Sequence, residues 1–125
     1  MKEPLKIEET VDTPFVEMDS EKRILKISGR SLPEDAVRFY APLKEWLLAY
    51  ISTPNPATEF IFEMDYYNSA SAKQFIIILT MLERLVNAGK ELKVIWYFNK
   101  EDEVMMDKGE EIQAMTSVPF ELRSY

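Results

Sequence analysis

Strand-like and helix-like segments alternate along most of this chain, and that alternation limits the possible folds more than any other feature. Residues 91–98 are apolar on nearly both faces, which is typical of a strand that is covered on both sides. Residues 58–64 place Phe60, Phe62 and Met64 on one face and acidic side chains on the other, as in a half-buried strand. A helical pattern separates the two segments, which predicts a crossover connection and parallel pairing in the middle of a sheet.

The flanking segments complete the order. Residues 15–18 and 24–27 show partial period-two alternation and predict an opening hairpin that adds antiparallel pairing at the edge. Ser31 and Glu34 have the spacing of a capping box, which predicts a first helix from there to about residue 52. The three glycines, Gly29, Gly89 and Gly109, each lie near an expected element end or bend. The full expected order is a hairpin, a helix to about 52, a strand at 58–64, a helix from 69 or 71 to 88, a strand at 91–98, a helix at 101–115 capped by Asn99, and a strand at 120–123.

This order, β-β-α-β-α-β-α-β, predicts an α/β fold: a small mixed β-sheet with packed helices. The 125 residues are 46% apolar, which is sufficient for one packed core, so we expect a single domain over residues 1–125.

The composition excludes several classes of function. The chain has no Cys and no His, so we expect no disulfide, thiol nucleophile, imidazole base, usual zinc site or cofactor. Its 15 Lys and Arg against 22 Asp and Glu leave a formal net charge of −7, which opposes binding to nucleic acid or anionic membranes. The beginning of the chain lacks the apolar stretch of a signal peptide, and we expect a cytoplasmic protein.

The segment after the strand at residues 58–64 is the candidate site, because sites in open α/β sheets form at the carboxyl ends of strands. Ser69 and Ser71 lie at the start of the next helix, where a phosphate would meet backbone N–H groups, the helix dipole and the nearby Lys73. The residues alone favour a simpler interpretation, in which Asn68, Ser69 or Ser71 only caps the helix. The preceding Tyr66 and Tyr67 either contact a partner or line the core.

Two further features have less specific interpretations. The helix after Lys73 has more apolar residues than one buried stripe needs, so Ile76, Ile77 and Met81 form either a partner-binding flank or a flank that a neighbouring helix covers. The acidic residues between 101 and 111 lack the spacing of a calcium loop and fit a solvated helix face. No pair of carboxylates suggests a general acid and base, so we expect no enzyme and no metal site.

Several stretches in order resemble the SiaC-like bacterial regulatory phosphoproteins over nearly the whole chain. They are GRSLPE at 29–34, FYAPLKEWL at 39–47, YNSASAK at 67–73 and VIWY at 94–97, together with the acidic 101–103 and Pro119-Phe120. The resemblance implies a fold like that of the STAS-domain anti-sigma-factor antagonists, and a switch protein without catalysis of its own.

In that family a dedicated Ser/Thr protein kinase phosphorylates a hydroxyl in an Asn-Thr-Ser-Ser-Ser-Lys-like motif and a protein phosphatase removes the phosphate. The unmodified form binds and activates a diguanylate cyclase, in cyclic di-GMP signalling. Aligning the motif on residues 68–73 places Ser69 where the family carries a phosphorylated Thr, with Ser71 as second choice, while Ala70 and Ala72 replace hydroxyls. The expected partner contacts are Tyr66, Tyr67, Asn68, Ser69, Lys73, Ile76 and Ile77.

The alternative is a constitutive interaction module without phosphorylation, such as a homodimer formed through Ile76, Ile77 and Met81.

Overall fold

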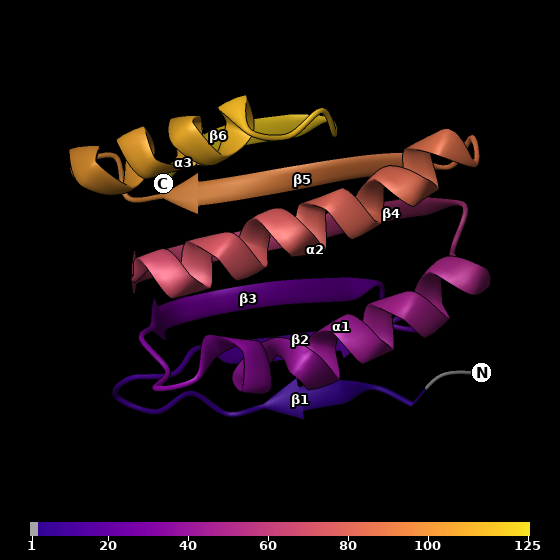
Figure 1. Ribbon diagram of the computed structural model, residues 1–125. Helices are drawn as coiled ribbons and strands as arrows, with labels where there is room; N and C mark the ends of the chain where they lie inside the picture. Colours follow the sequence, from indigo (N-terminus) through magenta and orange to yellow (C-terminus); the bar gives the residue numbers. More distant parts are fainter. Residues whose placement is uncertain (1–2) are drawn as a thin grey trace.

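The computed structural model describes residues 3–125 as one six-stranded sheet with three helices (Figure 1). The strands lie in the order β1-β2-β3-β4-β5-β6, so neighbours along the chain are neighbours in the sheet. β1 and β2 pair antiparallel, as do β2 and β3, while β3 to β6 are parallel. The elements are β1 (Leu5–Ile7), β2 (Phe15–Asp19), β3 (Ile24–Ser31), α1 (Ala36–Ser52), β4 (Ala57–Tyr67), α2 (Ser69–Asn87), β5 (Glu91–Phe98), α3 (Glu103–Ala114) and β6 (Phe120–Ser124).

The predicted α/β fold and its parallel centre are confirmed, and one strand was missed. β1 has only three residues, which is too short to show a period-two pattern, and the prediction therefore began at β2. Its pairing with β2, with Leu5 opposite Met18, puts a third antiparallel strand at this edge of the sheet.

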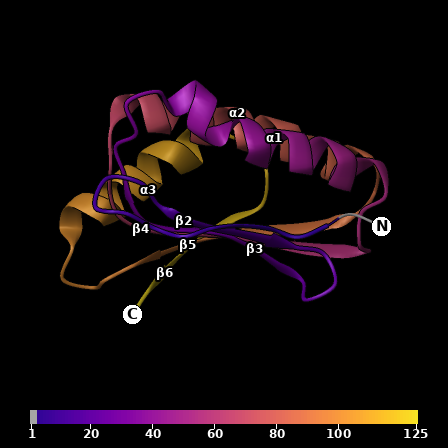
Figure 2. The ribbon, with the colours of Figure 1, turned by 90° about the horizontal axis from the view of Figure 1, so that it is seen from below.

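All three helices lie on one face of the sheet, and the other face is open (Figure 2). The expectation that residues 91–98 are covered on both sides is therefore wrong. Ile95 points to the open face and is nevertheless only 1% exposed, between Ile61 and Glu121 in the neighbouring strands. Long charged side chains flank it, with Glu121 paired to Lys93 at 2.7 Å and to Arg123 at 2.7 Å. Apolar stem atoms of such side chains bury a neighbour without a second layer of helices.

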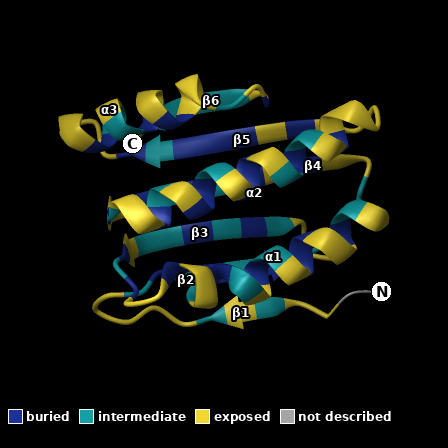
Figure 3. Ribbon diagram, in the orientation of Figure 1, coloured by how far each residue is buried: buried dark blue, intermediate teal, exposed yellow. Residues whose placement is uncertain are grey.

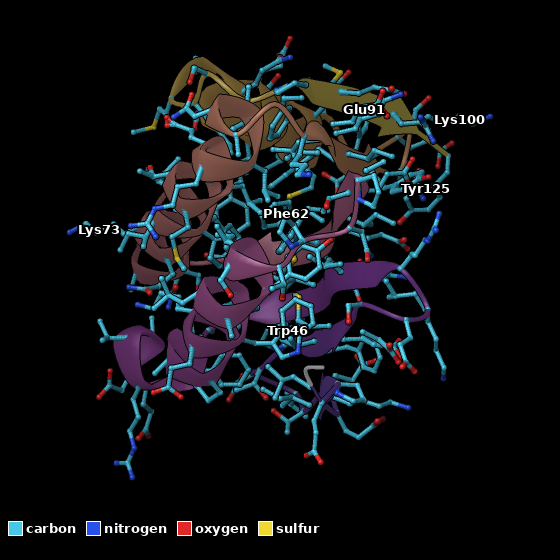
Figure 4. All side chains as sticks on the ribbon, turned by 90° about the vertical axis from the view of Figure 1, so that its right-hand side faces the viewer. Trp46, Phe62, Lys73, Glu91, Lys100 and Tyr125 are labelled. Atoms are coloured by element: carbon cyan, nitrogen blue, oxygen red, sulfur yellow. The ribbon has the colours of Figure 1, made fainter. Side chains whose placement is uncertain are left out.

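Most of the buried residues of the core belong to β4, β5, α1 and α2. Figure 3 colours the buried positions of these elements dark blue. Phe62 lies at the centre, with ring centroids 5.0 Å from Phe75 and 5.4 Å from Trp96 (Figure 4). The side chains of α1 that face the sheet are all buried: Ala36, Tyr40, Leu43, Trp46, Leu47 and Tyr50.

Two helix starts differ from the prediction. Asp35, not Ser31, caps α1, and its carboxylate accepts a hydrogen bond from Arg38 N at 3.1 Å. Asp102, not Asn99, caps α3 by accepting from Met105 N at 3.0 Å. In both places the loop before the helix is longer than the pattern indicated, and an aspartate next to the helix makes the cap.

Gly109 also differs from expectation, because it lies inside α3 rather than at an element end. Gly29 and Gly89 do lie at a strand irregularity and a helix end, with φ of 98° and 80°. Within residues 3–125, no helix combines the length and apolar character needed to cross a membrane.

Candidate functional site

The site begins with an irregularity where β3 and β4 pair. Gly29 is opposite Met64 but Arg30 is opposite Tyr66, so Asp65 is an extra residue in β4. An extra residue reverses which side chains face each side of a sheet. Tyr67 therefore turns toward the helices and is 4% exposed, whereas Tyr66 is 40% exposed.

The two tyrosines thus have different roles. The Tyr67 ring packs against Phe75 and Trp96, at centroid distances of 5.1 Å and 5.9 Å. Burial, with a smaller contribution from the charge of Glu111, raises the pKa of Tyr67 well above its usual value. The expectation that Tyr67 contacts a partner is corrected, because its side chain belongs to the core. Tyr66 remains available on the surface.

Asn68 connects β4 to α2 and caps the helix. Its side-chain oxygen accepts from Ser71 N at 2.9 Å, and its own backbone N–H donates to Ser31 O at 3.1 Å. The helix begins at Ser69, one of the two starts predicted. The capping role of this segment is confirmed, and it belongs to Asn68, which leaves the Ser69 side chain unused as a cap.

Ser69 and Ser71 have opposite environments. Ser69 is exposed on the first turn of α2, whereas Ser71 is completely buried. The Ser71 hydroxyl lies 2.7 Å from the Ser31 hydroxyl and donates to Ser31 O at 3.0 Å. The choice of Ser71 as a second phosphorylation position is therefore corrected, because a kinase cannot reach a fully buried hydroxyl.

A buried group of three hydroxyls thus holds the first turn of α2 in place. The Ser31 hydroxyl also lies 2.6 Å from the Tyr40 hydroxyl of α1, and burial raises the pKa of Tyr40 well above its usual value. This group was not predicted, because the spacing of Ser31 and Glu34 indicated a capping box instead. The sequence pattern could not have predicted this role of Ser31, because a serine at the end of a strand is as common in helix caps and turns.

Three cationic side chains, Arg30, Lys73 and Lys108, lie around the segment of residues 66–73 that joins β4 to α2. Lys73 is exposed one turn after Ser69 and points outward from α2 (Figure 4). Lys108 of α3 places its Nζ 4.6 Å from the centroid of the Tyr67 ring and 5.5 Å from that of Tyr66. The Arg30 guanidinium carbon lies 5.6 Å from the Tyr66 centroid. Arg30 and Lys108 come from β3 and α3, far from residues 66–73 in the chain, so no local sequence pattern predicts that they lie here.

The apolar flank of α2 is mostly covered. Ile76 and Met81 are half-buried and pack against the core. Ile77 is 43% exposed. Of these three side chains, only Ile77 is turned to the surface, and the other two are partly covered.

The acidic residues of the α3 region lie mostly on its exposed face. Among residues 3–125, no group of three or more acidic, His or Cys side chains is arranged to hold a metal ion.

Comparison with solved structures identifies the fold. Apo-SiaC from Pseudomonas aeruginosa superposes with a TM-score of 0.89 at 23% identity, covering 98% of this chain and 99% of that one. A structure of the diguanylate cyclase SiaD in complex with its activator SiaC, from the same organism, matches with a TM-score of 0.90 at 24% identity, covering 97% and 99%. The fold of this chain is therefore the fold of SiaC.

The sequence comparisons extend this to family membership. An uncharacterized protein of Pseudomonas aeruginosa strain UCBPP-PA14 is 24% identical over 121 residues, which is 97% of this chain and 96% of that protein. The model of the SiaC family of regulatory phosphoproteins matches residues 7–125. This chain belongs to the SiaC family, as the resemblance in its motifs predicted.

Proposed function

We propose that this protein is a phosphorylation-controlled binding protein whose unphosphorylated form binds and activates a diguanylate cyclase. A Ser/Thr protein kinase adds phosphate to Ser69 and switches the protein off, and a protein phosphatase removes it. The chain itself has no catalytic role. The observation that carries the proposal is the exposure of Ser69 at the helix start while Ser71 is buried.

Two findings about relatives support the choice of partner and modification. The family is described as one of regulatory phosphoproteins, and its SiaC member from Pseudomonas aeruginosa is the activator of the cyclase SiaD. The proposed contact surface consists of Tyr66, Asn68, Ser69, Lys73 and Ile77, all at least partly exposed on β4 and α2. Ile76 is half-buried and packs against the core, so only part of its side chain is available to this surface.

The mechanism follows from charge and hydration. A phosphate adds about −1.5 to −2 charges at pH 7 to a protein whose net charge is already −7. It also places a strongly hydrated group where the partner has to pack, and removing water from such a group is costly. Phosphorylation therefore releases the partner.

The first experiment maps phosphorylation by mass spectrometry on protein purified from its own host with phosphatases blocked. We expect phosphate on Ser69 and none on Ser71. A chain that stays unmodified over residues 69–71 in all growth conditions contradicts the switch.

The second experiment measures binding of Ser69 variants to a diguanylate cyclase of the same host by calorimetry. Ser69→Ala should keep the affinity of the unmodified protein, and Ser69→Asp should lower it about tenfold or more, because a carboxylate carries part of the phosphate charge. Ser52→Asp is the matched control, since it adds the same charge at the opposite end of the helical layer (Figure 1). Full affinity in Ser69→Asp, or lost affinity in Ser69→Ala, contradicts the proposal.

The alternative of a constitutive homodimer through Ile76, Ile77 and Met81 has less support. Of these side chains only Ile77 is largely exposed, and a stable dimer needs a larger apolar contact. Sedimentation of the purified protein distinguishes the two functions, because a tight dimer of unphosphorylated protein would favour the alternative.

A further inference from the structure

Positive charge gathers around Tyr66 at the carboxyl ends of β3 and β4, on a chain that is acidic overall. The Arg30 guanidinium and the Lys108 ammonium both lie within 5.6 Å of the centroid of the Tyr66 ring. Arg30 is also tied to the loop before β2, since its Nε donates to Val11 O at 3.3 Å. Lys108 has no such hydrogen bond among the described residues, and its ammonium group lies over the rings of Tyr66 and Tyr67.

These cations have no acidic partner. Within residues 3–125, no carboxylate oxygen lies within 4.0 Å of the charged nitrogens of Arg30, Lys73 or Lys108. A contact with an aromatic ring holds an ammonium group more weakly than a charge-assisted hydrogen bond to a phosphate. The ammonium groups of Lys73 and Lys108 are therefore free to bind an anion such as a phosphate.

Lys73 and Lys108 belong to different helices and lie near the segment of residues 66–69. Lys73 follows Ser69 by four residues on α2, and side chains at this spacing are neighbours on one helix face. Lys108 approaches from α3, with its ammonium 4.6 Å from the ring of Tyr67, two residues before Ser69. The acidic groups nearby are Glu111, whose charge acts on Tyr67, and Asp65 in β4.

We propose that Lys73 and Lys108 together bind the phosphate of phosphorylated Ser69, so that a phosphate monoester is held between α2 and α3. This inference rests on the proposed function and adds the residues that recognise the modification. On binding phosphate, Lys108 leaves the ring of Tyr66, which stays against Arg30. The phosphorylated protein then presents a different surface around Tyr66 from the one that the unmodified protein offers its partner.

The test uses the full chain with phosphoserine installed at position 69 during translation, so that no kinase is needed. Phosphorus NMR follows the second ionisation of the phosphate, whose ordinary pKa is about 6. Nearby cations stabilise the dianion and lower that pKa. Lys73→Gln and Lys108→Gln should each raise it by about half a unit, the effect expected from one charge at about 5 Å in water.

The control is Lys90→Gln, which removes the same charge just beyond the opposite end of α2. The 19 residues of α2 span about 28 Å, well beyond the screening length of about 8–10 Å in physiological salt. We expect no change in the phosphate pKa for Lys90→Gln and none for Lys108→Arg, which keeps the charge.

The inference is overturned if Lys108→Gln titrates like the unmutated phosphoprotein, or no differently from Lys90→Gln. Melting curves of each variant show that the fold is intact, and neither lysine is fully buried. This titration is independent of the mass spectrum of the native protein. An unmodified Ser69 in the host overturns the switch, whereas an unresponsive phosphate overturns only the roles of the two lysines.

Discussion

At the scale of single residues, Gly109 sets how closely α3 can approach the sheet. A Cβ atom at this position would lie 2.5 Å from Trp96 Cδ1 and 2.6 Å from Trp96 Nε1. The same indole nitrogen donates to Met105 O at 3.1 Å, so the ring meets one face of α3 at both Met105 and Gly109. A glycine inside a helix normally weakens it, and here the close approach of Trp96 requires it.

Gly109→Ala should therefore destabilise the protein, because overpacking a core usually costs about 1–3 kcal/mol. The gain of about 1 kcal/mol that alanine brings to an unconstrained helix offsets part of this loss, so the net destabilisation should be about 2 kcal/mol at most. Urea unfolding followed by tryptophan fluorescence measures the change. Glu110→Ala, at the exposed neighbouring position, is the control and should change stability little. A Gly109→Ala protein as stable as the original would contradict this account of the contact.

At the scale of elements, the pairing of β5 with the edge strand β6 is supported by charges on the open face. Glu121 of β6 bonds to Arg123 and to Lys93 of β5, each at 2.7 Å. The hydrogen bond from Arg123, followed by the one from Lys93, lowers the pKa of Glu121 from 4.5 to about 2. The ionised carboxylate is thus favoured in the folded protein.

The sign of the pH dependence follows from this shift. A carboxyl whose pKa is lowered by folding contributes stability above its unfolded pKa, and the contribution is lost as pH falls toward the folded value. The melting temperature of Glu121→Gln should lie below that of the original protein from about pH 5 upward. The difference should shrink between pH 4.5 and 2. Because these side chains are exposed, it should also be small and decrease in high salt.

Thermal unfolding monitored by circular dichroism across this pH range measures the difference. Glu91→Gln, at an exposed position of β5, is the control and should show no such dependence. A difference for Glu121→Gln that persists unchanged at pH 2 would show that the carboxylate does not act through its charge.

At the scale of the whole molecule, the three helices cover one face of the sheet only (Figure 2), so the free energy of local opening should differ between the central and the edge strands. β4 and β5 are paired on both sides and lie under the helices, whereas β1 and β6 form the two edges of the sheet (Figure 2). Local opening is easiest where few buried contacts hold the backbone.

Hydrogen exchange followed by mass spectrometry should therefore find the slowest amides in β4 and β5. Peptides from β1, with its three residues, should exchange first, and those from β6 should exchange faster than those from β5. Protection of β6 equal to that of β4 would indicate that something covers this edge of the sheet in solution.

Hydrophobic periodicity alone determined the α/β fold, the parallel centre and the position of α2, because patterns of period two and 3.6 are local properties of the chain. The motif around residues 68–73 indicated the family and the candidate Ser69. Only the tertiary structure decided which side chains of that motif are accessible. The extra residue Asp65 turns Tyr67 inward and Tyr66 outward, and contacts with Ser31 and Tyr40 bury Ser71. Strand register and contacts between distant segments leave no local pattern, so these outcomes required the folded chain.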